Sequence, residues 1–223
     1  MSLSRRLRAI GHLVPPVDTV ADVGTDHGLL AEELLLTNKA RKVIATDISL
    51  PSLKKAEGRL HGLGEDFRGR WEIRLGDGLS VLDEGESQGI ILAGMGGLLL
   101  KSLLEDAMEL VKSQTYILLQ PMQGYEALLN YISSQAYEIL GLDFVEDGGK
   151  YYPLILLTHG GQNTLSWEDF FMFPDFRGYC QLERNRYRQI LEEHPAAEGD
   201  AMARVRENLK KWEMLYDESG RHC

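Results

Sequence analysis

The chain has almost no cysteine. Its 223 residues include two, Cys180 and Cys223, which provide neither a disulfide framework nor the paired spacing of a zinc site. Long apolar runs are also missing, since no segment approaches the roughly 20 apolar residues that a membrane-spanning helix needs. The basic residues 1–8 are not followed by the apolar core and cleavage site of a secretory signal. These absences predict a soluble, cytoplasmic protein with no membrane segment.

Positive charge is scarce as well. Lys and Arg number 24 against 34 Asp and Glu, which gives a formal net charge of −10. Proteins contact nucleic-acid phosphates mainly through Lys and Arg, so the total charge favours a small-molecule or protein substrate unless basic residues gather locally. Arg5, Arg6 and Arg8 do gather, around the apolar face of a helix predicted over residues 3–14. They are candidate nucleic-acid contacts, and an ordinary solvated helix face is the alternative.

Residues 20–30 carry the clearest signal in the sequence. An apolar run that ends in Asp22 and Val23 leads into residues 24–28 (Gly-Thr-Asp-His-Gly), and an amphipathic run follows. A strand that ends in a glycine turn and opens a helix is typical of the nucleotide-binding corner of an open α/β sheet. Glycine lets the backbone approach a ligand, and the helix start offers free N–H groups. A second apolar run ends in Asp47, at the usual position of a ribose acceptor.

Two carboxylates distinguish this turn from a dinucleotide site. Asp22 precedes the first glycine and Asp26 lies within the turn, so a pyrophosphate would be repelled. A ligand that carries an ammonium and a sulfonium group but no phosphate would be attracted, and S-adenosylmethionine (SAM) is such a ligand. The pattern therefore predicts a SAM site rather than an NAD site, with an ordinary strand–turn–helix as the alternative.

Two later strands are also predicted to end in glycine turns. Residues 70–75 precede Gly-Asp-Gly at 76–78, where Asp77 suits the adenine amino group of SAM, although a simple Asp-Gly turn would look the same. Residues 89–93 are apolar without alternation, as in a central parallel strand, and precede Gly-Met-Gly-Gly at 94–97. We expect this turn to face the transferring methyl group and a helix to follow over 97–112.

The order of elements predicts the fold class. Strands and helices alternate, and two strands then flank the Asp-Gly-Gly turn at 147–149 as a hairpin. We therefore expect an α/β fold over residues 1–161, a Rossmann-like SAM methyltransferase sheet of parallel strands with an antiparallel last strand. Residues 162–223 are expected to form a second domain. It comprises an aromatic-rich connector that covers the side of the sheet domain, and a coiled-coil-like hairpin of helices over 177–194 and 198–217.

Several segments together resemble the bacterial tRNA (adenine(22)-N1)-methyltransferase family, over nearly the whole chain. They are Leu3–Leu7, Ala21–His27, Ile91–Gly97 and Ile117–Pro121. The resemblance implies a SAM-binding Rossmann-like domain, a helical C-terminal domain, tRNA as the partner and methylation of N1 of adenine 22. The chain departs from the family pattern at Ala31, where Pro is frequent, and at Met122, where Asn is frequent; the second departure puts recognition of the base in question.

Apart from the arginines of the first helix, the expected site residues lie at or just after the ends of strands. Asp26 is the catalytic candidate, because its carboxylate would stabilise the cationic N1-methyladenine product or accept a proton from the exocyclic amine. The cofactor contacts expected are Asp22, Gly24, Thr25, Asp26, His27, Gly28, Asp47, Ile48, Gly76, Asp77, Gly78, Ala93, Gly94 and Met95. The substrate contacts expected are Arg5, Arg6, Arg8, Gly96, Gly97, Gln120 and Pro121.

No metal is expected, because SAM brings its own leaving group. The sequence lacks the Asn/Asp-Pro-Pro-Tyr motif that many amino-methylating enzymes carry after the fourth strand. Two alternatives therefore stay open. The chain could be a SAM methyltransferase that acts on a small molecule or a protein, or a non-catalytic SAM-binding interaction module.

Overall fold

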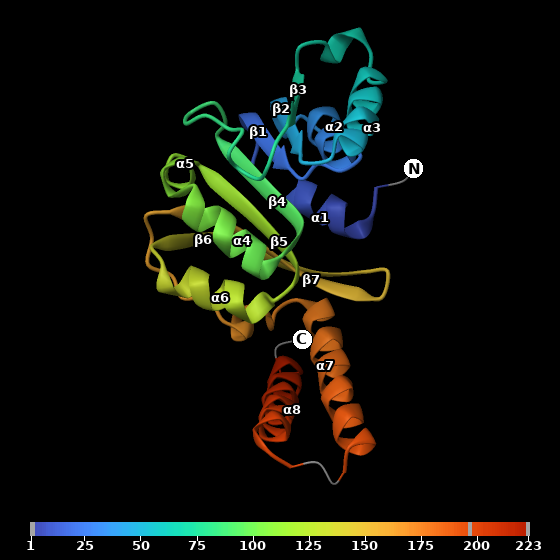
Figure 1. The fold of residues 1–223 in the computed structure, drawn as a ribbon, viewed down its shortest axis with the longest axis vertical. Helices are drawn as coiled ribbons and strands as arrows, with labels where there is room; N and C mark the ends of the chain where they lie inside the picture. The colour runs from blue at the N-terminus through green and yellow to red at the C-terminus, as the bar shows by residue number, and fades with distance from the viewer. Residues whose placement is uncertain (1–2, 196–197, 222–223) are drawn as a thin grey trace. The chain divides into compact units, whose positions relative to one another are not determined.

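A computed structural model describes residues 3–195 and 198–221 of the chain (Figure 1). It divides into two compact units. The sheet unit extends to Asp143 and includes Tyr152–Leu165, and the helical unit comprises Phe144–Tyr151 and the chain from Ser166 onward. Cys180 is buried as a free thiol, whereas Cys223 lies outside the described residues. Within the described residues, no helix has the length and hydropathy needed to cross a bilayer.

The sheet has seven strands in the order β3-β2-β1-β4-β5-β7-β6. Its strands are β1 (Val17–Val23), β2 (Ala40–Asp47), β3 (Trp71–Leu75), β4 (Gly89–Gly96), β5 (Tyr116–Gln123), β6 (Tyr137–Asp147) and β7 (Lys150–His159). Strands β1 to β5 pair in parallel, and β7 pairs antiparallel with β5. The predicted α/β class, with an antiparallel closing hairpin, is confirmed. Strand order reverses between β1 and β4, the switch point at which open α/β sheets bind ligands.

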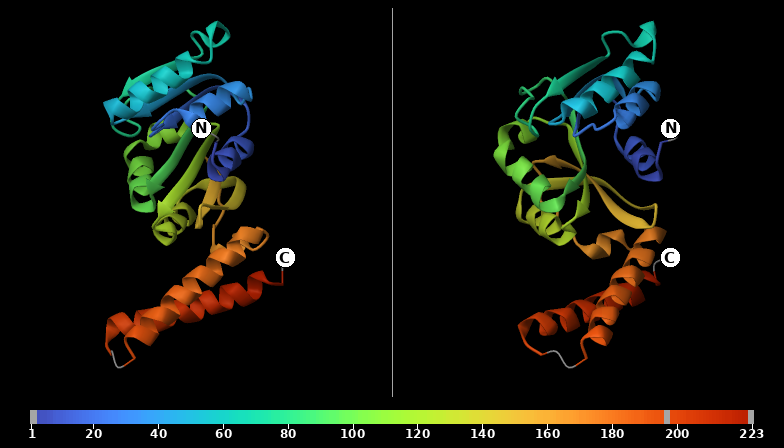
Figure 2. Two further views of the ribbon diagram at one scale, coloured as in Figure 1. Left: turned by 90° about the vertical axis from the view of Figure 1, so that its right-hand side faces the viewer. Right: turned by 45° about the vertical axis from the view of Figure 1, so that its right-hand side comes forward.

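Helices cover both faces of this sheet. They are α1 (Arg5–Leu13), α2 (Leu29–Leu36), α3 (Leu50–His61), α4 (Gly97–Asp106), α5 (Met108–Lys112) and α6 (Tyr125–Ser134), with a short 3₁₀ turn η1 (Glu65–Phe67). Helices α2 and α3 pack on β2 and β3, and α4 packs on β4 and β5; the right view of Figure 2 shows α1–α3 and α4–α6 on opposite faces. This double cover explains the continuous apolar runs of the central strands.

Local signals place most helix ends. Helix α3 begins after Ser49, whose hydroxyl accepts from the Ser52 N–H, and Pro51 lies in its first turn. The single helix expected over 97–112 is wrong: α4 ends at Asp106, Ala107 leaves the helical region at φ −117° and ψ 36°, and α5 follows. No glycine or proline marks this break, so the sequence pattern contained no sign of it.

The helical unit is an antiparallel helical pair, as predicted, of α7 (Pro174–Glu193) and α8 (Asp200–Ser219). Helix α7 begins at Pro174, earlier than predicted, because proline is well suited to the first helical turn. The aromatic connector includes a 3₁₀ turn η2 (Trp167–Phe170). Its Trp167 ring lies 5.3 Å from Trp212 and 5.8 Å from Phe176. The Phe170 ring of the connector also lies 5.5 Å from Phe144 of β6, a strand residue that belongs to the same unit. The connector therefore packs as part of the helical unit, and the expectation that it covers the side of the sheet domain stays a prediction.

Candidate active site

The carboxyl ends of β1 to β4 meet at one edge of the sheet and line two hollows that share Gly24. The first, here called the β1 hollow, has a volume of about 320 Å³. The predicted residues that line it are Arg6, Asp22, Gly24, Thr25, Asp26, His27, Ala93 and Gly94. The second, the β2 hollow, has a volume of about 120 Å³. The predicted residues that line it are Gly24, Asp47, Ile48, Gly76, Asp77, Gly78 and Met95.

Asp22 is the buried charge of the β1 hollow. It ends β1 with 3% of its surface exposed, and the Thr25 hydroxyl donates to its Oδ2 atom over 2.6 Å. Burial raises the pKa of the Asp22 carboxyl to about 6, and the negative charge of Asp47 adds to the rise, while the hydrogen bonds from Thr25 and the Ala31 backbone oppose it. A carboxylate that is this poorly solvated is stabilised by a cationic ligand.

The turn after Asp22 needs unusual backbone angles. Gly24, Asp26 and Gly28 have φ of +74°, +51° and +69°, in the left-handed region that side chains other than Asn and Asp rarely adopt. A Cβ on Gly28 would also lie 2.9 Å from Ala56 of α3. Asp26 consequently points outward, with 71% of its side chain exposed and Oδ1 3.3 Å from the His27 ring. Gly28 shapes the turn and caps α2.

Helix α3 braces this turn, which sequence reasoning missed. Arg59 donates from Nε to the His27 carbonyl over 2.9 Å and from Nη1 to Glu32 over 2.7 Å. Lys55 Nζ lies 3.1 Å from His27 Nε2, and the Ser52 hydroxyl lies 3.4 Å from Asp26 Oδ1. Polar residues at 52, 55 and 59 follow the spacing of one helix face, and this spacing is the only trace that the sequence carries.

Asp47 joins the β1 and β2 turns. Its Oδ2 accepts from the Asp26 N–H over 3.0 Å, and its Oδ1 accepts from the Ser49 N–H over 2.8 Å. Each carboxylate oxygen has a second lone pair, so Asp47 can still accept hydroxyl groups of a ribose. In the same hollow, Ile48 is 71% exposed and offers an apolar surface.

Two glycines that line the β2 hollow pack too closely on their neighbours for a Cβ. A Cβ on Gly76 would lie 1.9 Å from Val81, and one on Gly78 would lie 2.3 Å from Leu103. Both contacts are far closer than packed carbon atoms tolerate, so these turns admit glycine alone without rearrangement.

The predicted substrate residues differ in where they lie relative to the two hollows. Arg6 of α1 lines the β1 hollow and donates to the Gln120 side chain, whose Oε1 also accepts from the Gly94 N–H over 3.1 Å. Gln120 and Pro121 are themselves buried and line neither hollow. Gln120 is therefore linked to the lining of the β1 hollow through its hydrogen bonds with Arg6 and Gly94.

The remaining predicted substrate residues lie outside the hollows. Arg5 and Arg8 are exposed on α1. Gly96 precedes α4, and Gly97 packs so closely on Gly124 that a Cβ there would lie 2.3 Å from the Gly124 oxygen. Met122, noted above as a departure from the family pattern, does line the β1 hollow.

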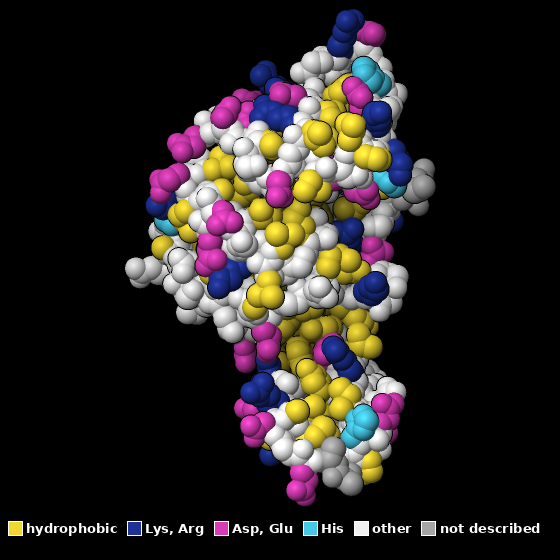
Figure 3. All heavy atoms as spheres, in the orientation of Figure 1, with side chains coloured by type: hydrophobic (Ala, Val, Ile, Leu, Met, Phe, Trp, Pro, Cys, Tyr) yellow, Lys and Arg dark blue, Asp and Glu magenta, His cyan; other side chains and the backbone are white. Residues whose placement is uncertain are grey.

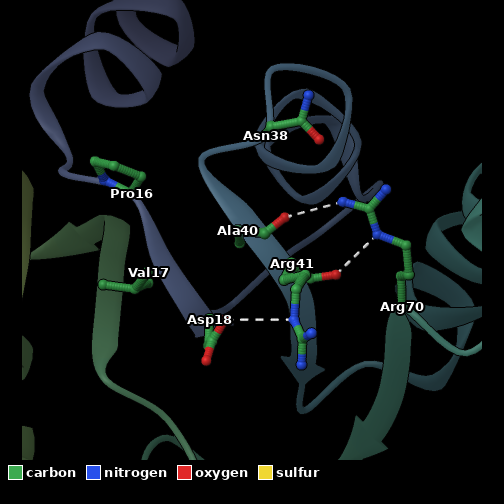
Figure 4. Close-up of a pocket in the computed structure, with 7 residues that line it drawn as sticks. All are labelled: Pro16, Val17, Asp18, Asn38, Ala40, Arg41 and Arg70. Carbon is green, nitrogen blue, oxygen red and sulfur yellow. Dashed lines mark hydrogen bonds and ion pairs between the residues drawn. The ribbon is translucent and has the colours of Figure 1, made fainter.

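A third hollow, at the amino ends of β1 and β2, contains none of the predicted residues (Figure 4). Arg70 donates there to the carbonyls of Arg41 and Ala40 over 2.9 and 3.4 Å, and Asp18 pairs with Arg41 at 3.3 Å. These charged groups satisfy one another and the strand ends. The carboxyl edge remains the candidate site. In the part of the chain that the structure describes, no three His, Cys, Asp or Glu side chains gather as a metal site would require.

Comparisons with known proteins agree with this geometry. The family described as "Methyltransferase domain" matches residues 3–155. The tRNA (adenine(22)-N(1))-methyltransferase of Bacillus subtilis is 28% identical over 164 residues, which cover 74% of this chain and 68% of that protein.

Solved structures of similar proteins share the fold. The m1A22 tRNA methyltransferase of B. subtilis aligns with a TM-score of 0.79 and 23% identity, over 98% of each chain. An M. capricolum protein, TrmK, in complex with S-adenosylhomocysteine (SAH) aligns with a TM-score of 0.83 and 21% identity, over 97% of this chain and 99% of that one. The resemblance expected from the sequence is confirmed, and the chain belongs to the methyltransferase domain family.

Proposed function

We propose that this protein is a SAM-dependent methyltransferase that modifies N1 of adenine 22 in tRNA, in the cytoplasm. The observation that carries the proposal is the β1 hollow, which brings buried Asp22 together with Asp26, Arg6 and Gly94 at the switch point of the sheet. The B. subtilis relative named above supports the choice of tRNA and of the adenine position.

The two hollows fit a cationic nucleoside without phosphates. Asp22, which burial shields from water, would bind the ammonium group of the methionine part of SAM. Asp47 would accept hydrogen bonds from the ribose hydroxyls. Ile48, Met95 and Asp77 in the β2 hollow would surround the adenine. Bound SAM supplies the methyl group and a thioether leaving group.

The chain's own contribution to the reaction is positioning and charge. Adenine N1 must leave its base pair and approach the methyl group in line. Met122 lines the β1 hollow and is 36% exposed, so it offers apolar surface there for an unstacked base. Asp26 would stabilise the positive charge that N1 acquires as it takes up the methyl group.

Local basic residues answer the objection raised by the net charge of −10. Arg5 and Arg8 are exposed on the same helix that brings Arg6 into the β1 hollow, so phosphates near the target base would meet three cations. Elsewhere, on the face seen in Figure 3, acidic and basic side chains are mixed. We therefore place the tRNA contact of the sheet unit at α1.

The direct test is methyl transfer from labelled SAM to unmodified tRNA, with the modified position mapped by reverse-transcription stops. The expected result is incorporation at N1 of adenine 22 and none in a transcript that carries guanine there. Transfer to a small molecule or protein but not to tRNA would contradict the proposal. SAM binding without any transfer would also contradict it and would favour the interaction module.

The raised pKa of Asp22 predicts that SAM affinity depends on pH. A protonated Asp22 has no charge with which to hold an ammonium group, and its pKa is about 6 before the ligand binds. Affinity should therefore be constant above about pH 7 and fall by about tenfold per pH unit below pH 6. Calorimetric titrations between pH 5 and 7.5 measure this directly. An affinity that does not change over this range would exclude Asp22 as the ammonium partner.

A further inference from the structure

The side chain of Thr46 carries a buried hydroxyl. Thr46 is 1% exposed at the end of β2, and its Oγ1 has no hydrogen-bond partner among the described residues. Buried hydroxyls are nearly always paired, because an unpaired one has lost its water without compensation. An exception at a strand end therefore calls for a ligand or an explanation.

The position of Thr46 is well determined by its backbone. Its carbonyl accepts from the N–H groups of Gly24 and Thr25, both over 2.9 Å. It is paired in parallel register with Val23 of β1 and Arg74 of β3, so these three side chains share one face of the sheet. This is the face that α4 covers, since Leu99 and Leu103 of α4 line the same hollow as Thr46.

The surroundings of the hydroxyl are mostly apolar. Thr46 lines the β2 hollow together with Val23, Met95, Leu99 and Leu103. An apolar hollow suits an aromatic ring, and a hydroxyl-bearing residue in its lining suits a ring that carries hydrogen-bonding atoms at its edge. A threonine hydroxyl can donate to a ring nitrogen or accept from an amino group.

We propose that Thr46 hydrogen-bonds the adenine base of the cofactor and so contributes to recognition of the nucleoside. This inference rests on the proposed function, because it assumes that SAM occupies the two hollows. The base rather than the methionine part is the partner, since Asp47 lines the same hollow as Thr46 while Asp22 lines the other. A bound adenine would thus give the Thr46 hydroxyl the hydrogen-bond partner that it lacks among the described residues.

The test is Thr46→Val, which removes the hydroxyl and keeps the shape. In calorimetry the variant should bind SAH about 5- to 10-fold more weakly than wild type. It should bind adenosine more weakly by a similar factor, because the lost contact is to the base. The melting temperature of the ligand-free variant should be unchanged or higher, since an unpaired buried hydroxyl is gone. Thr46→Ser retains the hydroxyl and should bind SAH within about twofold of wild type.

A matched control is Thr158→Val on β7, whose hydroxyl donates to the Gln114 carbonyl over 3.1 Å. It should lower the melting temperature without changing SAH affinity. Wild-type affinity for SAH in Thr46→Val would overturn the inference and leave the proposed function standing, as would weaker SAH binding with unchanged adenosine binding. A wild-type protein that takes up no SAH would overturn both.

Discussion

Replacing Asp22 by asparagine is expected to weaken SAM binding by about 100-fold and, at the same time, to stabilise the ligand-free protein. The first effect follows because a buried charge pair is replaced by a neutral contact, at a cost of about 3 kcal/mol. The second follows because the rise in the pKa of Asp22 from 3.8 to about 6 means that the folded, ligand-free protein ionises this group at a cost of about 3 kcal/mol near neutral pH.

The sign of the stability effect can be checked against pH. In the wild type the cost is present above pH 6 and fades as the pH falls towards 3.8, because the folded state then binds the proton more readily than the unfolded state. The variant lacks this dependence and should be about 1 to 3 kcal/mol more stable than wild type at pH 7.

Urea denaturation and calorimetry measure the two effects of Asp22→Asn separately. The control is Asp18→Asn on the same strand, where the side chain is 73% exposed and pairs with Arg41 at the opposite sheet edge. Asp18→Asn should change neither the SAM affinity nor the free energy of unfolding appreciably. An Asp22→Asn protein with normal SAM affinity would contradict our assignment of the ammonium site, and one that is less stable than wild type would contradict the electrostatic account.

Replacing Asp26 by asparagine should lower kcat by about 100-fold while SAM affinity stays within about threefold of wild type. Asparagine is chosen because, like aspartate, it tolerates the φ of +51° at this position, so the turn keeps its shape. The Asp26 carboxylate is 71% exposed. We expect it to stabilise the positive charge on N1 once the bound base excludes water from it. Single-turnover methylation of tRNA measures the chemical step apart from product release.

The result for Asp26→Asn distinguishes a catalytic role from a role in cofactor binding. Unchanged kcat would remove the catalytic role. A loss of SAM affinity as large as the loss of kcat would place Asp26 among the cofactor contacts instead. Asp66→Asn, at another exposed aspartate, is the control for a general effect of charge on tRNA binding and should leave both constants unchanged.

The fold, and the gathering of the proposed cofactor residues at one end of the sheet, were predictable because the signals are local in sequence. Each parallel strand is an apolar run that ends in a glycine turn, and parallel strands deliver those turns to one edge. Asp22, Asp47 and Asp77 therefore lie at the positions expected from their place after each run.

The substrate side was less predictable because its contacts join distant segments. Arg6 meets Gln120 across 114 residues, whereas Arg5 and Arg8 of the same helix are exposed and are not among the residues that line the hollow. The brace from Arg59 and the buried state of the Thr46 hydroxyl likewise depend on how α3 and α4 pack. The aromatic connector could not be assigned from sequence, since aromatic residues bury themselves against any available core.

The most direct measurement is a pair of calorimetric titrations, one with SAH and one with NAD⁺. The carboxylates of Asp22, Asp26 and Asp47 should admit the ammonium-bearing nucleoside and repel the pyrophosphate. We expect saturable binding of SAH and no binding of NAD⁺ at the same concentrations. A protein that binds NAD⁺ but neither SAH nor SAM would contradict both our assignment of the cofactor site and the proposed activity.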